Sequence, residues 1–254
     1  MRIHYLQHVA FEGPAFISQW CREKGHSLTG TQLYNHEAVP PLNQFDLLLI
    51  MGGPMNIYEE EKYPWLKYEK SFIKEAIQNH KAVLGICLGA QLITDVLGGK
   101  VTRNPQREIG WFEVDFNSEA KSFEVFEGFP ERLTVFHWHG DTFSKLGEGA
   151  VSIASSEGCA NQAFIYGDRV IGFQFHMECT EAGIVSLMEG CADEMSGGSY
   201  VQSKEQIYQR MGCVKADNLL MADFLERLGL LCSGKERAWK KSDISREFAA
   251  IKQK

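Results

Sequence analysis

A cysteine flanked by two glycines carries the clearest chemical signal in this 254-residue sequence. An apolar run over residues 82–86 leads into Gly85-x-Cys87-x-Gly89, and apolar residues resume at helical spacing from Leu92. This arrangement is typical of a nucleophile elbow, a strained turn between strand and helix that lifts the central side chain out of the sheet. The N–H groups and dipole of a helix N-terminus favour the thiolate, which is the attacking species. We therefore predict that Cys87 is a nucleophile, although most cysteines in apolar runs are small buried hydrophobes.

A thiol nucleophile needs a base that takes its proton and later protonates the leaving amine, usually a histidine held by a third group. Residues 170–178 have the pattern of a core strand that ends in His176-Met177-Glu178. Positions i and i+2 of a strand point to the same side, so Glu178 is expected to reach the imidazole of His176 and fix its tautomer. The alternative is that His176 only caps the end of the strand.

His137 and His139 form a rival pair among the eight histidines. They are candidates for the base or for metal ligands, because His-x-His is a common ligand spacing. We find no clear cysteine or carboxylate set that completes a metal site, so we predict no metal and favour a structural or substrate-edge role. The loop at residues 196–199 resembles a nucleotide-binding loop only faintly, because no strand precedes it and no Lys-Ser/Thr follows. No cofactor is predicted.

The elements that must position these residues alternate between strand-like and helical patterns, which predicts an α/β fold of the flavodoxin-like, doubly wound kind with a largely parallel sheet. Shorter β-like runs between residues 100 and 175 are typical of an antiparallel extension. After Thr180 we expect two amphipathic helices. The predicted elements are strands at 3–9, 46–51 and 82–86, helices at 14–24 and after Pro64, and C-terminal helices whose apolar faces hold Ile184, Leu187, Met188, Cys191 and Met195 in one and Leu220, Phe224, Leu228 and Leu231 in the other.

Composition sets the wider frame. Hydrophobic residues make up 44% and charged residues 23%, as in an ordinary globular enzyme, and the formal net charge of -7 argues against nucleic acid as the main partner. No stretch reaches the length of a membrane span and no signal peptide is evident, so we expect a cytoplasmic protein. The seven cysteines include no C-x-x-C pair, which predicts reduced thiols. We expect a single domain over residues 1–254, with a helical extension at about 180–254.

Four segments of the first 180 or so residues resemble the class I glutamine amidotransferases, and most closely the free-standing relatives of the GMP synthetase glutaminase domain. Residues 51–54, Met-Gly-Gly-Pro, resemble the oxyanion strand. Residues 85–91 resemble the nucleophile segment, and residues 175–178 resemble the His-x-Glu segment. Residues 108–111, Glu-Ile-Gly-Trp, resemble the loop that holds the α-amino and carboxyl groups of the substrate.

The resemblance implies a Cys87-His176-Glu178 triad that hydrolyses a γ-glutamyl amide through a thioester. It also implies an oxyanion hole formed by the backbone N–H groups of Gly53 and Leu88. The other substrate-binding residues that it implies are Gly52, Gln91, Gly110 and Trp111. His139-Gly140-Asp141 is similar to a segment of GMP-synthetase-like members, where we expect an accessory role.

Two departures from the family pattern stand beside the triad. Met177 occupies the position of a usual proline, and Cys179-Thr180 replaces a commoner serine. The chain also has no recognisable ATP-binding motif, and the roughly 75 residues after His176 are too few for a synthetase domain. An ammonia acceptor would therefore belong to a separate subunit.

Three functions are consistent with these residues. The first is a glutaminase of the amidotransferase type. The second is a free-standing γ-glutamyl peptidase that acts on glutathione-like compounds, which would need an open pocket beside the leaving group. The third is a thiol-based redox or stress protein of the related flavodoxin-like superfamily. In those proteins a histidine commonly follows the cysteine, whereas Leu88 follows it here.

Overall fold

The computed structural model describes residues 1–233, and its centre is one nine-stranded sheet in the order β2-β1-β3-β4-β9-β8-β7-β5-β6. The first five strands in this order are parallel, and the remaining pairs are antiparallel. The predicted α/β fold, with a largely parallel sheet and an antiparallel extension, is therefore confirmed. The parallel strands are β1 (Arg2–Gln7), β2 (Ser27–Gln32), β3 (Leu47–Ile50), β4 (Ala82–Ile86) and β9 (Val170–Phe173).

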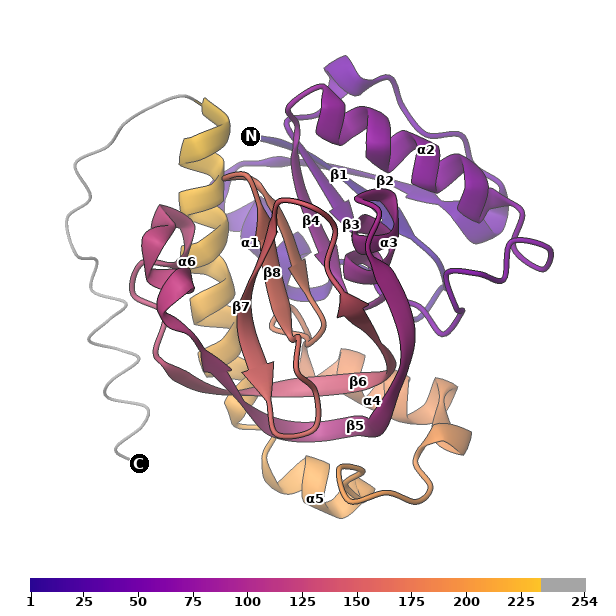
Figure 1. The fold of residues 1–254 in the computed structure, drawn as a ribbon, viewed down its shortest axis with the longest axis vertical. Helices are drawn as coiled ribbons and strands as arrows, with labels where there is room; N and C mark the ends of the chain where they lie inside the picture. Colours follow the sequence, from indigo (N-terminus) through magenta and orange to yellow (C-terminus); the bar gives the residue numbers. More distant parts are fainter. Residues whose placement is uncertain (234–254) are drawn as a thin grey trace.

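Helices cover both faces of the parallel half, which explains why its central strands are continuous apolar runs (Figure 1). Leu47 and Leu49 of β3 pack toward the face covered by α1 (Ala15–Lys24) and α6 (Cys213–Ser233). Leu48 and Ile50 pack toward the opposite face, covered by α2 (Trp65–Gln78) and α3 (Leu88–Val96). The sheet thus separates two apolar cores.

The antiparallel half is dominated by a two-stranded arm, β5 (Lys100–Phe116) with β6 (Arg132–Lys145). Strands β7 (Ala150–Ser156) and β8 (Ala163–Tyr166) link it to β9. The prediction of short runs was wrong for the arm, whose strands have 17 and 14 residues. A register shift between Arg103 and Glu108 interrupts the alternation of apolar and polar residues, so the length of β5 is hidden in the sequence.

The arm continues away from the parallel strands, and α4 (Glu181–Gly190) and α5 (Lys204–Gln209) lie below it in Figure 1. A third apolar core fills the space between the arm and these helices, with Trp111, Phe136, Ile184 and Ile207 among its members. The α4 helix ends at Gly190, so Met195, which we predicted to continue its apolar face, lies beyond it.

Two further predictions need correction. Helix α5 was not predicted because it is only 6 residues long, although the capping box of Ser203 and Gln206 marks its start. The strand predicted to run to Glu178 ends at Phe173, and His176 makes only an isolated bridge to Phe136. The last part of the predicted helical extension, residues 234–254, lies outside the described residues. Among the helices of residues 1–233, none has the length and apolar character needed to cross a bilayer.

Candidate active site

The turn from β4 into α3 holds Cys87 in a strained conformation, with φ 51° and ψ −107°. Both neighbouring glycines are required by close packing. A Cβ at Gly85 would lie 2.5 Å from the carbonyl carbon of Gly89, and a Cβ at Gly89 would overlap the carbonyl of Ile50. The elbow therefore forms because the sequence omits side chains at the two points where the backbone of α3 crosses the sheet.

His176 and Glu178 follow β9, which lies beside β4, and this placement brings them to the same edge of the sheet as Cys87. The Nδ1 of His176 lies 2.7 Å from Oε1 of Glu178, and both residues are buried. The predicted pair therefore forms in the bend after the strand instead of within the strand. The other ring nitrogen, Nε2, makes no hydrogen bond in this resting geometry and is the nitrogen available to the thiol.

Burial alone would lower the pKa of His176, but the charge of Glu178, together with interactions with the Cys179 and Cys87 thiols, raises it well above the usual value. Burial raises the pKa of the Cys87 thiol, and His176 opposes this shift through a hydrogen bond and its charge. The pair thus stabilises the imidazolium that forms when the ring takes the thiol proton. Cys179 stands beside this pair, but burial raises its pKa to about 12, which makes it a poor nucleophile.

Two backbone N–H groups beside Cys87 are free to bind an oxyanion. Leu88 is the first residue of α3, and its N–H interacts with the Cys87 sulfur. Within residues 1–233, no protein group accepts a hydrogen bond from the N–H of Gly53. Gly52 allows the backbone to pass close to the elbow, because a Cβ there would overlap the carboxylate of Glu12 and lie 3.5 Å from the Cβ of Cys87.

A cavity of about 280 Å³ opens beside Cys87, at the carboxyl ends of the parallel strands. Of the predicted residues, Gly53, Cys87 and Gln91 line it. The Gln91 amide donates to Oε1 of Gln174 at 3.2 Å and to the carbonyl of Asp141 at 3.3 Å.

Other residues that line the cavity were not predicted as site residues: Glu12, Asn56, Glu59, Arg103, Arg107 and Glu194. Glu12 could have been found, because it follows closely after β1 at the edge where ligands bind in such sheets. The pKa of Glu12 is raised, chiefly by burial, and Glu178 adds to this shift, whereas His176 opposes it.

Gly110 and Trp111 are not among the residues that line the cavity. Their segment is part of β5 and not a loop, with Gly110 paired to His137 and Trp111 to Phe136. The Trp111 side chain is buried in the third core, and its Nε1 donates to the carbonyl of Ile207 at 3.2 Å. The structure therefore brings together the triad, Gly52, Gly53, Leu88 and Gln91, and it leaves Gly110 and Trp111 apart from them.

Comparison with known proteins agrees with this geometry. The family model described as glutamine amidotransferase class-I matches residues 17–183, which include all three residues of the triad. The chain belongs to the class I glutamine amidotransferase family. The match begins after Glu12, so that cavity residue lies outside it.

Individual relatives extend the similarity over most of the chain. It is 33% identical over 246 residues to the glutamine amidotransferase-like protein YfeJ of Salmonella typhimurium, which covers 92% of this chain and 100% of that protein. It is 36% identical over 210 residues to a glutamine-hydrolyzing GMP synthase of Staphylococcus carnosus, but the chain spans only 38% of that enzyme. The crystal structure of a glutamine amidotransferase from Thermotoga maritima has a TM-score of 0.81 at 35% identity and covers 90% of this chain and 97% of its own.

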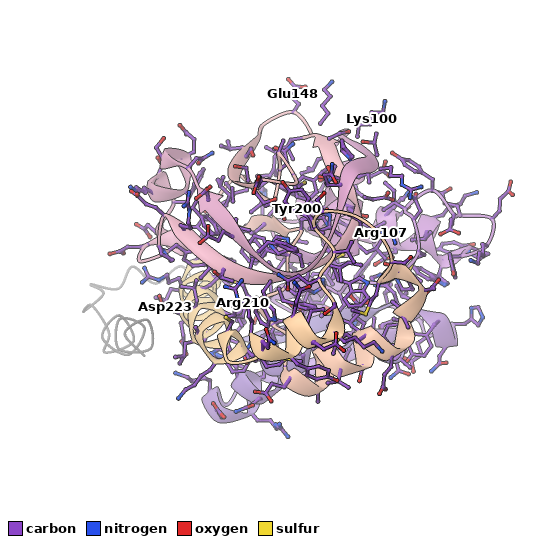
Figure 2. The ribbon with its side chains drawn as sticks, turned by 90° about the horizontal axis from the view of Figure 1, so that it is seen from below. Lys100, Arg107, Glu148, Tyr200, Arg210 and Asp223 are labelled. Atoms are coloured by element: carbon purple, nitrogen blue, oxygen red, sulfur yellow. The ribbon has the colours of Figure 1, made fainter. Side chains whose placement is uncertain are left out.

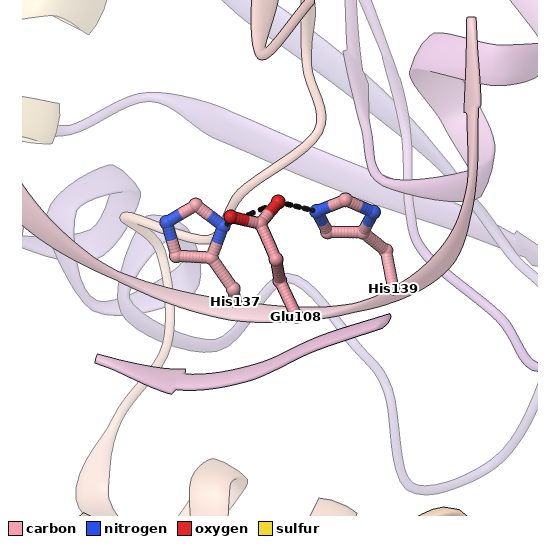
Figure 3. Close-up of side chains that lie close together, drawn as sticks. All are labelled: Glu108, His137 and His139. Atoms are coloured by element: carbon pink, nitrogen blue, oxygen red, sulfur yellow. Dashed lines mark ion pairs between the residues drawn. The ribbon is translucent and has the colours of Figure 1, made fainter. Parts of the chain in front are cut away.

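This amidotransferase carries a second buried histidine-carboxylate group on the β5–β6 arm, in which Glu108 lies between His137 and His139 (Figure 3). The Nε2 of His139 lies 2.9 Å from Oε2 of Glu108, and its Nδ1 lies 3.0 Å from the carbonyl of Asp141. Because both ring nitrogens of His139 are occupied, it is poorly placed to accept the Cys87 proton. The rival pair predicted from the sequence is therefore less suited to act as the base than His176.

Glu108, His137 and His139 also have ligand atoms close enough together to hold a metal ion. However, the Glu108 carboxylate already accepts hydrogen bonds from Ser156 at 2.7 Å and from Gln162 at 2.6 Å, besides its contact with His139. An ion would have to displace these donors, so the geometry favours a hydrogen-bonded cluster. Burial would raise the pKa of Glu108, but His139, His137 and Ser156 hold it at about 2, and burial lowers the pKa of His137 to about 3.

Proposed function

We propose that this amidotransferase hydrolyses the side-chain amide of glutamine through a γ-glutamyl thioester on Cys87. The observation that carries the proposal is the meeting of three features at one edge of the sheet: the strained Cys87, the His176–Glu178 pair and the two free N–H groups. Each feature suits one requirement of acyl transfer, namely a nucleophile, an acid–base group and a stabiliser of the oxyanion.

In the proposed reaction, His176 accepts the Cys87 proton as the sulfur attacks the amide carbon. The N–H groups of Gly53 and Leu88 bind the oxyanion of the tetrahedral intermediate. His176 then returns the proton to the leaving nitrogen, ammonia departs, and the γ-glutamyl thioester remains. Water, deprotonated by the same ring, attacks the thioester and releases glutamate together with the free thiol. Glu178 stabilises the imidazolium in both halves of the reaction.

The proposal includes a separate chain as the ammonia acceptor, if an acceptor is used. The relative named GMP synthase is much longer than this chain, which matches 38% of it. We place residues 1–254 in one amidotransferase-type domain, with the C-terminal helices as part of it, because α6 packs on the central sheet. We also place the protein in the cytoplasm, where its seven unpaired cysteines would stay reduced.

The extent of the cavity favours a second candidate, a γ-glutamyl peptidase that uses the same triad. The cavity continues from Cys87 to Arg103 and to Arg107, a residue of β5 labelled in Figure 2. Two guanidinium groups suit a leaving amine that carries a carboxylate, as a γ-glutamyl peptide does. Ammonia would need neither the added space nor the positive charge. The thiol-based redox protein gains no comparable support, because the triad gives Cys87 a partner for acyl transfer.

One experiment separates these functions. The purified protein is incubated alone with glutamine, with glutathione and with γ-glutamylglycine, and the release of ammonia, glutamate and the leaving amine is measured. Ammonia release from glutamine supports the glutaminase. Preferred release of the peptide amine supports the peptidase. If none of the three substrates is hydrolysed, the Cys87→Ala variant and the unsubstituted protein are compared again in the presence of candidate synthetase chains, and continued lack of turnover would exclude the proposal.

A further inference from the structure

His8 occupies a buried position between the backbone of the Gly-Gly segment and an acidic side chain of α2. It is the first residue after β1, and its Nδ1 lies 2.9 Å from the carbonyl oxygen of Gly52. Its Nε2 lies 2.9 Å from Oε1 of Glu69. Both side chains are 0% exposed, so water does not compete for these contacts. The ring also stacks on Trp65, with 5.4 Å between ring centroids.

The partners of His8 determine where its protons lie. A carbonyl oxygen can only accept, so the Nδ1 of His8 must carry the hydrogen that it donates to Gly52. The Glu69 contact then shares a second proton, carried either by Nε2 or by the carboxyl group. The second carboxyl oxygen of Glu69 has no hydrogen-bond partner among the described residues, so His8 is the polar partner of this carboxyl group. Glu69 thus fixes the ring, and the ring fixes the carbonyl of Gly52.

Fixing this carbonyl also fixes the N–H of the next residue. The C=O of Gly52 and the N–H of Gly53 belong to one planar trans peptide, so they point in opposite directions. The carbonyl points toward His8 and the buried side of α2. The N–H of Gly53 therefore points away from α2, and Gly53 lines the cavity that also contains Cys87.

Two adjacent glycines would not hold this orientation by themselves, because glycine has the widest conformational freedom of any residue. A side chain is also excluded at Gly53, where a Cβ would lie 3.0 Å from the Cβ of His8 and 3.1 Å from Cδ2 of Leu88. The segment must be both free of side chains and rigid. The hydrogen bond from His8 supplies that rigidity from outside the segment.

We propose that His8 and Glu69 are positioning residues, which hold the Gly52–Gly53 peptide so that the N–H of Gly53 faces the oxyanion formed at Cys87. This inference rests on the acyl chemistry of the proposed function, but it does not depend on glutamine as the substrate. Neither residue touches the reacting atoms. Their effect is exerted through one peptide group.

The test compares two reactions of Cys87 that differ in their need for an oxyanion hole. Attack on p-nitrophenyl acetate forms an acetyl thioester, expels p-nitrophenolate and passes through a tetrahedral oxyanion. Attack on iodoacetamide displaces iodide at a saturated carbon and forms no oxyanion. The rates that depend on Cys87 are obtained by subtracting those of the Cys87→Ala variant. The ratio of acylation to alkylation then reports the oxyanion hole separately from thiol reactivity.

We expect His8→Ala to lower this ratio by at least about tenfold, as a fraction of the 10²- to 10³-fold cost of removing an oxyanion donor outright. His8→Asn should recover part of the loss, because its amide nitrogen can replace Nδ1 as the donor to Gly52. Glu69→Gln keeps the volume of the side chain and should lower the ratio by a few-fold, as the ring loses its ionic partner. The matched control is His4→Asn on β1, since His4 is also buried and bonds through both nitrogens, to Thr29 at 2.8 Å and Thr31 at 3.0 Å.

An unchanged ratio in His8→Ala, or in both His8→Asn and Glu69→Gln if the alanine variant does not fold, would overturn the proposal. So would an equal fall in the His4 control. Absence of any acylation of Cys87 in the unsubstituted protein would remove the oxyanion site itself, and the proposal with it. If the ratio falls as expected but glutamine is not hydrolysed, the positioning role stands and the proposed substrate is wrong.

Discussion

Two buried histidine-carboxylate pairs in this molecule have nearly the same geometry and different chemical capacity. His176 lies 2.7 Å from Glu178, and His139 lies 2.9 Å from Glu108. The difference is in the second nitrogen. That of His139 faces the carbonyl of Asp141, whereas that of His176 makes no hydrogen bond and is left for Cys87. A carboxylate partner orients an imidazole, but a free nitrogen at the nucleophile is what allows it to act as a base.

The two pairs also sit on different parts of the sheet. His176 follows β9, next to β4 and its elbow, at the edge where parallel strands present their carboxyl ends. Glu108 and His139 face each other across the antiparallel pair β5–β6. Cross-strand pairing brings side chains together without exposing them to a cleft, which suits a structural cluster. The parallel half therefore supplies the chemistry, and the arm supplies one wall of the cavity.

Removing the nucleophile should have the largest effect. Cys87→Ala is expected to lower the turnover of glutamine by on the order of 10⁵-fold or more, because the covalent route is lost. In the unsubstituted protein, a diazoketone analogue of glutamine should alkylate Cys87 far faster than the other cysteines, five of which have a pKa raised by burial. Mass spectrometry of the labelled peptides measures this. Equal labelling of several cysteines would contradict the assignment.

Exchanging the two histidines for asparagine tests the comparison directly. His176→Asn should slow turnover by about 10²- to 10⁴-fold, the usual contribution of a general acid–base group. Glu178→Gln should slow it less and leave KM for glutamine nearly unchanged. His139→Asn should reduce turnover far less than His176→Asn, but it should lower the free energy of unfolding by about 3 kcal/mol, because it breaks a buried pair. Equal losses of turnover in the two asparagine variants would require the base to be reassigned.

The neutral histidine of the arm predicts an effect on stability at acid pH. Burial lowers the pKa of His137 to about 3, against roughly 6.5 in the unfolded chain. Between these values only the unfolded state takes up this proton, so the contribution of His137 to stability falls as the pH falls, by about 1.4 kcal/mol per pH unit. His137→Phe should remove that part of the slope. Its ring nitrogens have no hydrogen-bond partner to lose.

The measurement is the free energy of urea unfolding at pH 6 and pH 5 for both proteins. This window lies above the range in which Glu108, with a pKa of about 2, loses its own contribution. The contribution of Glu108 is complete above the unfolded pKa of about 4.5 and is lost only as the pH falls toward 2. Equal slopes in the two proteins would mean that His137 accepts a proton in the folded state.

The elbow and the sheet could be predicted because both are encoded locally. Glycines at 85 and 89 leave no other packing for the β4–α3 turn, and the run at Leu47–Ile50 suits only a strand buried on both faces. Glu12 and His8 were missed for the opposite reason. Their partners, Gly52 and Glu69, lie about 40 to 60 residues away in the sequence, and only the parallel sheet brings them together.

The segment from Glu108 to Trp111 shows where resemblance and structure diverge, and it gives the smallest expected effect on catalysis. Trp111 is buried, and its Nε1 donates to the carbonyl of Ile207. Trp111→Phe should therefore lower the free energy of unfolding by about 1 kcal/mol or slightly more, since a buried carbonyl loses its donor. KM for glutamine should stay within about twofold, because the side chain packs in the third core and does not line the cavity. The matched control is Trp20→Phe, since the indole nitrogen of Trp20 is buried without a hydrogen-bond partner and no such bond is lost. Urea unfolding and the glutamine dependence of ammonia release measure both quantities. A rise in KM of tenfold with little loss of stability would show that Trp111 reaches the substrate in the bound state, as the family resemblance implied.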